Sequence, residues 1–380
     1  MEINQLPETW QARWQSEKFQ TPTKIQEKVF DPIKQGQSIV GVSPTGSGKT
    51  IAYLLPTMLN ISVNQGVQLV VITATQELAM QVTEVARPWA KDLGLKVQSL
   101  IGGANIKRQI EKLKQRPEIV VGTAGRINEL NQQKKLKLHQ VKTLILDEAD
   151  QLLKSNQESA LLSPILKAMD NQVQVLAFSA SGTQLPEQFQ QMYRLKLTLI
   201  DVTNEDTSKG EITHGYVIWP KRDRLDFLRR LGNIDQISAL VFFNRLSELG
   251  VMEDKLLYHH IPVASLASDQ SAQLRKIALH AFSNHQAKLL LCTDIATRGL
   301  DIDDLSLVVN MDFVYDEKTY LHRSGRVGRM GRKGLVLTLL EECEVKEFQK
   351  FLAKQHLVAK EYYLYAGQLS NHKKKEKGCF

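Results

Sequence analysis

The sequence predicts an α/β protein of two domains, each a mainly parallel sheet covered by helices on both faces. At roughly 150 residues per domain, the length of 380 residues suggests two domains. The composition, 42% hydrophobic and 24% charged, is that of a globular protein and excludes disordered and fibrous chains. Short apolar runs rich in β-branched residues alternate with helix-length stretches, which is typical of parallel α/β layers.

The apolar runs are continuous rather than alternating, so we expect strands that are buried on both faces of their sheet. In the first half of the chain the expected strands are Ser38–Val42, Gln68–Thr73, Val97–Leu100, Glu118–Gly122, Thr143–Leu146, Val173–Phe178 and Leu197–Val202. In the second half they are Gly215–Trp219, Ala239–Phe243, Lys288–Cys292, Leu307–Asn310 and Leu335–Leu340. The two series predict two sheets, one in each half.

A polar stretch separates the two series. Residues 203–213 read TNEDTSKGEIT, in which Ile212 is the one large apolar residue and Gly210 lets the chain bend. We therefore expect a first domain at residues 1–205, a linker at 206–212 and a second domain at 213–366. The last residues, 367–380, are short and basic, and we expect them to be disordered.

The net charge is a first indication of a partner. Lys plus Arg number 49 against 41 Asp plus Glu, a net charge of +8. Residues 1–205 carry 23 basic and 19 acidic side chains, and residues 206–380 carry 26 and 22, so each half contributes +4. A modest, distributed excess fits a groove that follows a phosphate backbone, but it is also common in proteins that bind no nucleic acid.

Cysteine usage and the N-terminus bear on the compartment. Cys292, Cys343 and Cys379 lie far apart, so we expect neither a disulfide framework nor a cysteine zinc site. The N-terminal MEINQLPETW does not have the pattern of a secretory signal, and no apolar run approaches the roughly 20 residues that span a bilayer. We expect a cytoplasmic protein that does not enter membranes.

A phosphate-binding loop is indicated at residues 43–50, SPTGSGKT. An expected strand precedes it and an apolar, helix-like segment follows, which is the order that such a loop requires. Gly46 and Gly48 let backbone N–H groups turn toward an anion, and the helix N-terminus adds its dipole. Lys49 is expected to reach the β- and γ-phosphates, with the Thr50 hydroxyl facing Mg²⁺. The strict pattern has Gly where Ser43 stands, so a glycine-rich turn without this role is the alternative.

A group of carboxylates follows the expected strand at Thr143–Leu146. The chain there reads Asp147-Glu148-Ala149-Asp150. A carboxylate that leaves a buried strand beside a phosphate loop holds Mg²⁺ directly or through water, which is the role expected of Asp147. Glu148 is then placed to orient and deprotonate an attacking water. The alternative interpretation is a helix N-terminus that is rich in acids for its own stability.

A third motif lies in the second half. Residues 322–332 read HRSGRVGRMGR, and glycine-spaced arginines fit an arginine finger that neutralises charge on a transferred phosphoryl group. A solvated basic loop is the alternative. The segment just upstream, residues 291–301, contains two further charged candidates for this site, Arg298 and Asp301.

Together these motifs resemble a DEAD-box ATP-dependent RNA helicase of superfamily 2, of the compact bacterial type with a minimal helicase core, over about Trp10 to Glu341. The resemblance implies two RecA-like domains, ATP and Mg²⁺ as cofactors, and RNA held through its backbone without sequence preference. It implies RNA-stimulated ATP hydrolysis that locally unwinds or remodels short RNA duplexes. It also suggests a monomer that acts on ribosomal RNA or pre-ribosomal particles.

The resemblance assigns the ATP site residue by residue. Phe19 is expected to stack on adenine and Gln26 to read its N6 and N7 edge. Asp301 is expected to contact the ribose, and His322 to link the arginine motif to the Asp147–Asp150 loop. The expected ATP-binding residues are Phe19, Gln26, Ser43, Thr45, Gly46, Ser47, Gly48, Lys49, Thr50 and Asp301. The expected catalytic residues are Lys49, Asp147, Glu148, His322, Arg326 and Arg329, the last two as fingers. Ser179 and Ser181, with Asp150, are expected to couple hydrolysis to strand separation.

The RNA side departs from the family pattern. The expected RNA-binding residues are Thr75, Gly102, Gly103, Thr123, Arg126, Arg275, Thr293 and Arg298. An arginine of the family is replaced by Gln76, a proline by Ala124, and a His-Gly pair and a glutamine by Ala267-Ser268 and Ala272. We therefore expect ordinary ATP binding but weaker RNA affinity than in a full-motif relative.

Three other functions remain open at this point. The replacement of several RNA-contacting residues of the family favours an ATP-gated RNA clamp or annealing factor that separates few strands. A DNA helicase or another phosphate-loop ATPase is the second alternative. The third is a pseudo-enzyme, which the intact Lys49, Glu148 and Arg329 argue against. Tyr362, Tyr363 and Tyr365 are interpreted as completing a core or sheet edge, with base stacking on RNA as the alternative.

Overall fold

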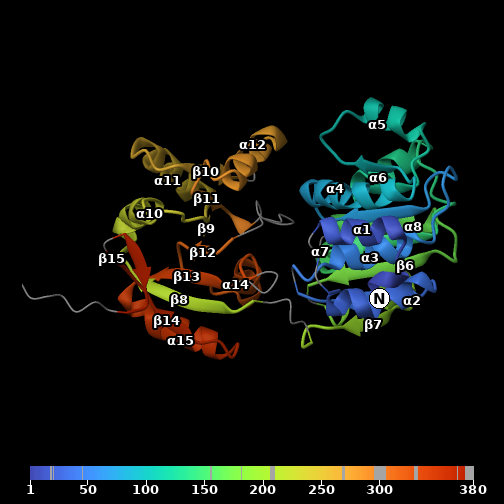
Figure 1. Ribbon diagram of the computed structural model, residues 1–380. Coiled ribbons are helices and arrows are strands. Elements are labelled where there is room, and N and C mark those ends of the chain that lie inside the picture. The colour runs from blue at the N-terminus through green and yellow to red at the C-terminus, as the bar shows by residue number, and fades with distance from the viewer. Residues whose placement is uncertain are drawn as a thin grey trace, which may run out of the picture. The chain divides into compact units, whose positions relative to one another are not determined.

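The chain forms two compact units, which we describe separately. The computed structural model describes residues 1–17, 19, 21–44, 46–154, 156–180, 182–205, 210–267, 270–294, 305–328, 333–365 and 367–372. The first unit is Met1–Ser208 and the second is Lys209–Phe380. Each contains one seven-stranded sheet with helices packed against it (Figure 1). No described helix has both the length and the apolar character needed to cross a bilayer.

The sheet of the first unit is entirely parallel, in the strand order β3-β4-β2-β5-β6-β1-β7. Its strands are β1 Ile39–Val42, β2 Leu69–Thr73, β3 Val97–Leu100, β4 Ile119–Thr123, β5 Thr143–Asp147, β6 Gln174–Ser179 and β7 Thr198–Asp201. Its helices are α1 Glu8–Ser16, α2 Lys24–Lys34, α3 Lys49–Met58, α4 Gln76–Asp92, α5 Ile106–Leu113, α6 Ala124–Gln132, α7 Ala149–Lys154, α8 Asn156–Lys167 and α9 Leu185–Tyr193, after a 3₁₀ turn at Ile3–Gln5.

The second unit repeats this arrangement, with the parallel order β10-β11-β9-β12-β13-β8-β14. Its strands are β8 Ile212–Ile218, β9 Ala239–Phe242, β10 Val263–Leu266, β11 Leu289–Cys292, β12 Leu307–Asn310, β13 Gly334–Leu340 and β14 Ala359–Glu361, followed by an antiparallel hairpin of β15 Tyr363–Tyr365 and β16 Gln368–Ser370. Its helices are α10 Arg224–Gly232, α11 Leu246–Tyr258, α12 Ala272–Ser283, α14 Glu317–Ser324 and α15 Val345–Ala353, with 3₁₀ turns at Lys221–Asp223 and Glu342–Glu344.

Each sheet separates two apolar cores, which explains why most residues of its central strands are apolar. Along β2, Val71 packs on the side of α1 to α4, whereas Val70 and Ile72 pack on the side of α6 to α9. In β9, Leu240 faces α12, α14 and α15, while Val241 faces α10 and α11. Successive strand residues point to opposite faces, so a strand covered on both faces needs apolar residues at every position. The predicted α/β class with two helix-covered parallel sheets is confirmed.

The structure differs from the sequence prediction at the ends of the second domain. β8 begins at Ile212, inside the predicted linker, because this apolar residue packs on the core of the second unit. The start of the predicted disordered tail is ordered instead, since β16 pairs with β15 there. Gly367, with φ of +70°, permits the tight turn of this hairpin. Residues 373–380 lie outside the described part of the chain.

Candidate active site

The phosphate loop follows the carboxyl end of β1, which lies between β6 and the edge strand β7. Gly46 and Gly48 have φ of +82° and +81°, in the left-handed region that glycine adopts without strain. Gly48 is the N-cap of α3, so the helix begins directly at Lys49. The buried Ser43 and Ser47 hydroxyls lie 2.7 Å apart and fix the two ends of the loop. The strand, the loop residues that the structure describes and the helix follow in the predicted order, and anion binding at the helix N-terminus stays a prediction.

Lys49 and Asp147 form the charged centre of this region. Lys49 Nζ donates to the carbonyl oxygens of Ser43 and Pro44, both at 2.8 Å. Asp147 ends β5 and is buried, and its Oδ2 accepts a 2.9 Å hydrogen bond from the hydroxyl of Tyr53. Burial raises the pKa of Asp147, while the Lys49 ammonium and the Tyr53 hydroxyl act in the opposite direction. These contacts hold the carboxylate in one orientation at the strand end.

Glu148 sits in a backbone conformation that is rare for its residue type. Its φ is +50°, and its N–H donates to Asp147 Oδ1 at 3.0 Å. A residue other than glycine in the left-handed region costs of order 1 kcal/mol or more and persists where its surroundings impose it. Here α7 begins immediately afterwards at Ala149, so the chain turns sharply between β5 and α7 at Glu148.

Ser179 connects the phosphate loop to the carboxylates. Its carbonyl oxygen accepts a 3.1 Å hydrogen bond from the N–H of Ser43. Its buried hydroxyl donates to Asp150 Oδ1 at 2.6 Å. β6 lies between β1 and β5 in the sheet, so the end of β6 is the one place from which a single residue reaches both neighbours. Asp150 also pairs with Lys154, at 3.1 Å.

The segment before α2 also packs against the phosphate loop. The hydroxyl of Thr23 donates to the carbonyl of Ser47 at 2.7 Å, and Gln26 Nε2 donates to the carbonyl of Gly48 at 3.2 Å. Gln26 Oε1 accepts from the N–H of Thr23 at 3.0 Å. The carboxamide of this buried residue is therefore fixed at both its nitrogen and its oxygen. Its contact with adenine stays a prediction.

Phe19, the expected adenine-stacking residue, belongs to an aromatic cluster. Its ring is parallel to that of Trp89 on α4, with centroids 6.4 Å apart, and meets Trp14 edge-on at 5.1 Å. Trp10 completes the cluster by donating its indole N–H to the carbonyl of Trp89 at 2.9 Å. The cluster fixes the position of Phe19 from one side.

The expected RNA residues of the first unit gather at the other half of the same sheet edge. Thr75, Thr123 and Gly102 follow β2, β4 and β3, which are adjacent strands. Arg126 Nη1 donates to the carbonyl of Ala104 at 3.4 Å, and its Nε pairs with Glu129 at 2.9 Å. Carboxyl ends of parallel strands meet at one edge, so the expected ATP and RNA residues share that edge.

In the second unit, Arg323 organises a buried polar cluster. Its guanidinium makes a two-pronged ion pair with Asp294, at 2.7 Å and 2.6 Å. It also donates to Asn310 at 3.1 Å and to Asn244 at 3.0 Å, and it lies 4.8 Å over the ring of Phe242. The side chain is 2% exposed. Arg323 thus ties α14 to the ends of β9, β11 and β12.

A second buried contact holds α14 at its start. Tyr320 lies with its hydroxyl 2.8 Å from Nδ1 of His214 on β8. Burial lowers the pKa of His214 to about 4, so this imidazole is neutral at physiological pH. His322 and Arg326 lie on and directly after the helix that these contacts fix. The predicted link from His322 to the Asp147–Asp150 loop joins residues of different units and stays a prediction.

The remaining predicted residues divide into two groups. Arg275 is buried on α12 and donates to the carbonyl of Ala267 at 3.3 Å, and Thr293 follows β11. The predicted residues outside the described part of the chain are Thr45, Ser181, Arg298, Asp301 and Arg329.

Sequence analysis assigned no role to Tyr53, Thr23 or Arg323. Tyr53 lies four residues after Lys49, one helical turn further on the same face of α3, and this spacing was the available signal. Thr23 stands three residues before Gln26, a capping-box spacing. Arg323 gave no such signal, because its ion-pair partner Asp294 is 29 residues away.

Comparison with known proteins identifies the family. The DEAD/DEAH box helicase family model matches residues 23–189, and that of the helicase conserved C-terminal domain matches residues 223–331. The chain is 38% identical to the probable ATP-dependent RNA helicase YfmL of Bacillus subtilis, over 94% of each chain. It is 37% identical to the DEAD-box ATP-dependent RNA helicase CshC of Bacillus cereus, over 97% of this chain and 96% of that one.

Solved structures agree with these sequence matches. S. cerevisiae Dbp5 bound to RNA and ADP BeF3 has a TM-score of 0.80 and 25% identity, over 94% of each chain. A DEAD box protein from the hyperthermophile Methanococcus jannaschii has a TM-score of 0.56 and 28% identity, over 94% of this chain and 97% of that one. With the phosphate loop, the Asp147–Asp150 carboxylates and both family domains in place, the chain belongs to the DEAD-box family of ATP-dependent RNA helicases.

Proposed function

We propose that this helicase couples RNA-stimulated ATP hydrolysis to the local opening of short RNA duplexes. The observation that carries the proposal is Ser179, which bonds both to the phosphate loop and to Asp150. A change in the phosphate loop on loss of the γ-phosphate would therefore shift Ser179 and, through it, the Asp150 carboxylate. Asp150 lies at the same sheet edge as Thr75 and Thr123, two of the proposed RNA residues. Strand displacement on a short duplex, with and without ATP, tests the proposal; RNA-stimulated hydrolysis without displacement would contradict it.

The residues of the first unit support direct roles in hydrolysis. Lys49 Nζ, which bonds to two loop carbonyls, exchanges them for oxygens of the β- and γ-phosphates. Glu148 orients the attacking water and accepts its proton. Arg326 and Arg329 neutralise charge on the γ-phosphate when ATP and RNA draw the two units together, because each ligand then binds groups of both units.

The oxygen donors near the phosphate loop fit a magnesium ion. Thr50 lies in the first turn of α3, and the Asp147 carboxylate is held at the end of β5 by Tyr53. Mg²⁺ is typically bound through one or two carboxylates together with substrate phosphates and water. Thr50 and Asp147 would hold the ion, partly through water, and it supplies positive charge to the β- and γ-phosphates.

Replacing Ser179 by alanine should separate hydrolysis from unwinding. The substitution removes the hydrogen bond to Asp150 and leaves the backbone bond to Ser43 intact. We expect ATP hydrolysis within a few-fold of wild type and strand displacement lowered roughly tenfold or more, since a lost buried hydrogen bond costs about 1–3 kcal/mol. Lys154→Ala is the control, because it removes only the exposed partner of Asp150. Equal losses of both activities in Ser179→Ala would refute the coupling role.

An ATP-gated RNA clamp with little strand separation is the second candidate, and Gln76 favours it. Gln76 stands where the family has an arginine, and its carboxamide lies against the Gly102–Gly103 backbone. A side-chain carbon added at Gly102 would lie 3.0 Å from Gln76 Nε2. A neutral amide therefore occupies the place of a phosphate-binding cation, which lowers RNA affinity.

Gln76→Arg should accordingly strengthen RNA binding. We expect a Kd for single-stranded RNA lowered roughly fivefold at low salt, because one added phosphate contact contributes a charge-assisted hydrogen bond. The slope of log Kd against log salt should steepen by about 0.7. The matched control is Gln115→Arg, which adds the same charge at an exposed position. Gln115 follows the C-terminus of α5, whereas Gly102 and Gly103 precede its N-terminus. A gain of equal size in the control would show that net charge alone acts.

We propose a cytoplasmic monomer acting on ribosomal RNA or pre-ribosomal particles. The positive net charge of +8 and the similarity to compact bacterial helicases support this role. Crosslinking in cells followed by sequencing of the bound RNA identifies the target, and enrichment of messenger RNA over ribosomal RNA would contradict the proposal.

A further inference from the structure

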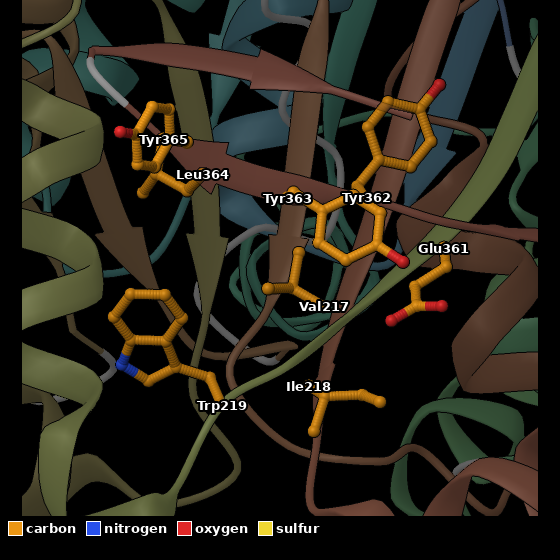
Figure 2. Close-up of a pocket in the computed structure, with 8 residues that line it drawn as sticks. All are labelled: Val217, Ile218, Trp219, Glu361, Tyr362, Tyr363, Leu364 and Tyr365. Atoms are coloured by element: carbon orange, nitrogen blue, oxygen red, sulfur yellow. The ribbon is translucent and has the colours of Figure 1, made fainter. Parts of the chain in front are cut away.

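The second unit carries an open groove that none of the proposed ATP or RNA residues lines. Its volume is about 220 Å³, and it runs along the end of β8 and the hairpin strand β15 (Figure 2). Its lining residues are Val217, Ile218, Trp219, Glu361, Tyr362, Tyr363, Leu364 and Tyr365. β8 and β14 form one end of the strand order, whereas Arg275 and Thr293 belong to the β10–β11 end. The groove is therefore separate from Arg275 and Thr293, the proposed RNA residues of this unit that the structure describes.

Aromatic side chains dominate the groove, and the apolar core does not account for all of them. Leu364 is 7% exposed and packs in the core, as the inward position of β15 requires. Tyr363 and Tyr365 alternate with it along the strand, and Tyr365 is 68% exposed. Trp219 is held in place, because its ring packs edge-on against Phe227 at 5.4 Å and its indole N–H donates to the carbonyl of Asp223 at 2.8 Å. The groove thus offers flat rings, one of them rigid, at the surface.

Basic side chains lie beside these rings. The Arg230 guanidinium sits 5.5 Å over the ring of Trp219. Residues 221–230, KRDRLDFLRR, contain five basic and two acidic side chains. Arg222 is 85% exposed and pairs with Asp223 at 3.5 Å, and Arg230 is 55% exposed and pairs with Asp226 at 2.7 Å. Each guanidinium has further N–H donors that an anion can use.

The two sides of the groove differ in charge because Glu361 lies on one of them. Figure 2 shows Glu361 on one side of the groove, with Trp219 and Tyr365 on the other and tyrosine rings between them. A carboxylate repels phosphate, so a polyanion would place its charges on the side of Arg222 and Arg230. Flat apolar rings combined with guanidinium groups along one side suit a ligand that has flat bases and a charged backbone.

We propose that this groove is a second RNA-binding surface, which holds single-stranded RNA by stacking bases on Tyr363 and Tyr365 with the phosphates toward Arg222 and Arg230. The proposal rests on the RNA binding proposed above and extends it beyond the helicase core. Stacking on aromatic rings tolerates every base, so the groove binds without sequence preference. The groove would therefore retain the single strand that flanks a duplex while the helicase core releases and rebinds the duplex itself.

Tyr365→Ala tests the groove in the full-length protein. We expect its Kd for a long oligo-uridine strand, measured by fluorescence anisotropy at fixed salt, to rise about fivefold or more, and the Tyr363→Ala/Tyr365→Ala double variant to lose more. The loss should be larger for the long strand than for one just long enough to stimulate ATP hydrolysis. Tyr365→Phe keeps the ring and should restore wild-type binding. Tyr258→Ala is the matched control, because that tyrosine on α11 is 81% exposed and outside the groove.

The outcomes separate this inference from the proposed function. If wild type binds RNA and its ATP hydrolysis is stimulated, but neither tyrosine variant changes the Kd, the groove is not an RNA site and suits a protein ligand instead. An equal loss in Tyr258→Ala would also overturn the inference. If wild type neither binds RNA nor responds to it, the proposed function fails as well.

Discussion

Replacing Glu148 by glutamine should stop ATP turnover while leaving ATP and RNA bound. Glutamine has nearly the same shape as glutamate, so the left-handed turn at this residue and its N–H bond to Asp147 are retained. A carboxamide cannot accept the proton of the attacking water, and loss of a general base typically lowers the rate about 10²- to 10⁴-fold. We expect kcat to fall by that factor in a steady-state phosphate-release assay, with Kd values for a fluorescent ATP analogue and for RNA unchanged.

Lys49→Ala is the informative comparison for this experiment. Lys49 is the cation aimed into the phosphate loop, so its loss should abolish binding of the same analogue. The pair of variants then distinguishes a group that reacts from a group that binds. Wild-type ATP turnover in either variant would refute the assignment of this site.

Replacing Arg323 by alanine should destabilise the second unit, with no direct effect on the hydrolysis step. The substitution leaves Asp294, Asn310 and Asn244 without the donor that they share, at a site where the arginine is 2% exposed. Breaking a buried ion pair on one side costs about 3–5 kcal/mol. We expect the free energy of unfolding of the second unit to fall by about that amount in urea denaturation followed by circular dichroism.

Arg326→Ala is the matched control, three residues along the same motif. It is half-buried and should leave the urea midpoint of the second unit close to wild type while lowering kcat for ATP. The opposite pattern, with a stable Arg323→Ala and an unfolded Arg326→Ala, would exchange the structural and functional roles that we assign.

The fold was predictable because the strands are buried on both faces. In the run Leu307–Asn310 the first three residues are apolar, and the structure has a strand there with the same bounds. The short edge elements were not predictable in this way. β14, Ala359–Glu361, has the sequence AKE, and it forms because β8 offers a free edge rather than because its own residues favour a strand.

The candidate site was predictable where chemistry fixes the spacing. The phosphate loop and the Asp147–Asp150 group need neighbouring residues in a set order, and local sequence records that order. Contacts between distant segments leave no such record: the bonds from Gln26 to Gly48 and from Arg323 to Asp294 follow from the packing of whole elements. Sequence analysis assigned Gln26 a contact with adenine, which stays a prediction, and did not predict its hydrogen bond to the loop.

The aromatic cluster around Phe19 gives this protein its own optical probes. Three of the four tryptophans, Trp10, Trp14 and Trp89, lie in the first unit near the ring proposed to meet adenine, and Trp219 lines the groove of the second. Because all four indoles emit in the same band, the native chain gives one summed signal. A Trp219→Phe variant keeps only the emission of the first group, which tracks the nucleotide pocket, and its difference from the native signal belongs to the indole beside the hairpin. Nucleotide and RNA can then be followed in the same sample without an attached dye.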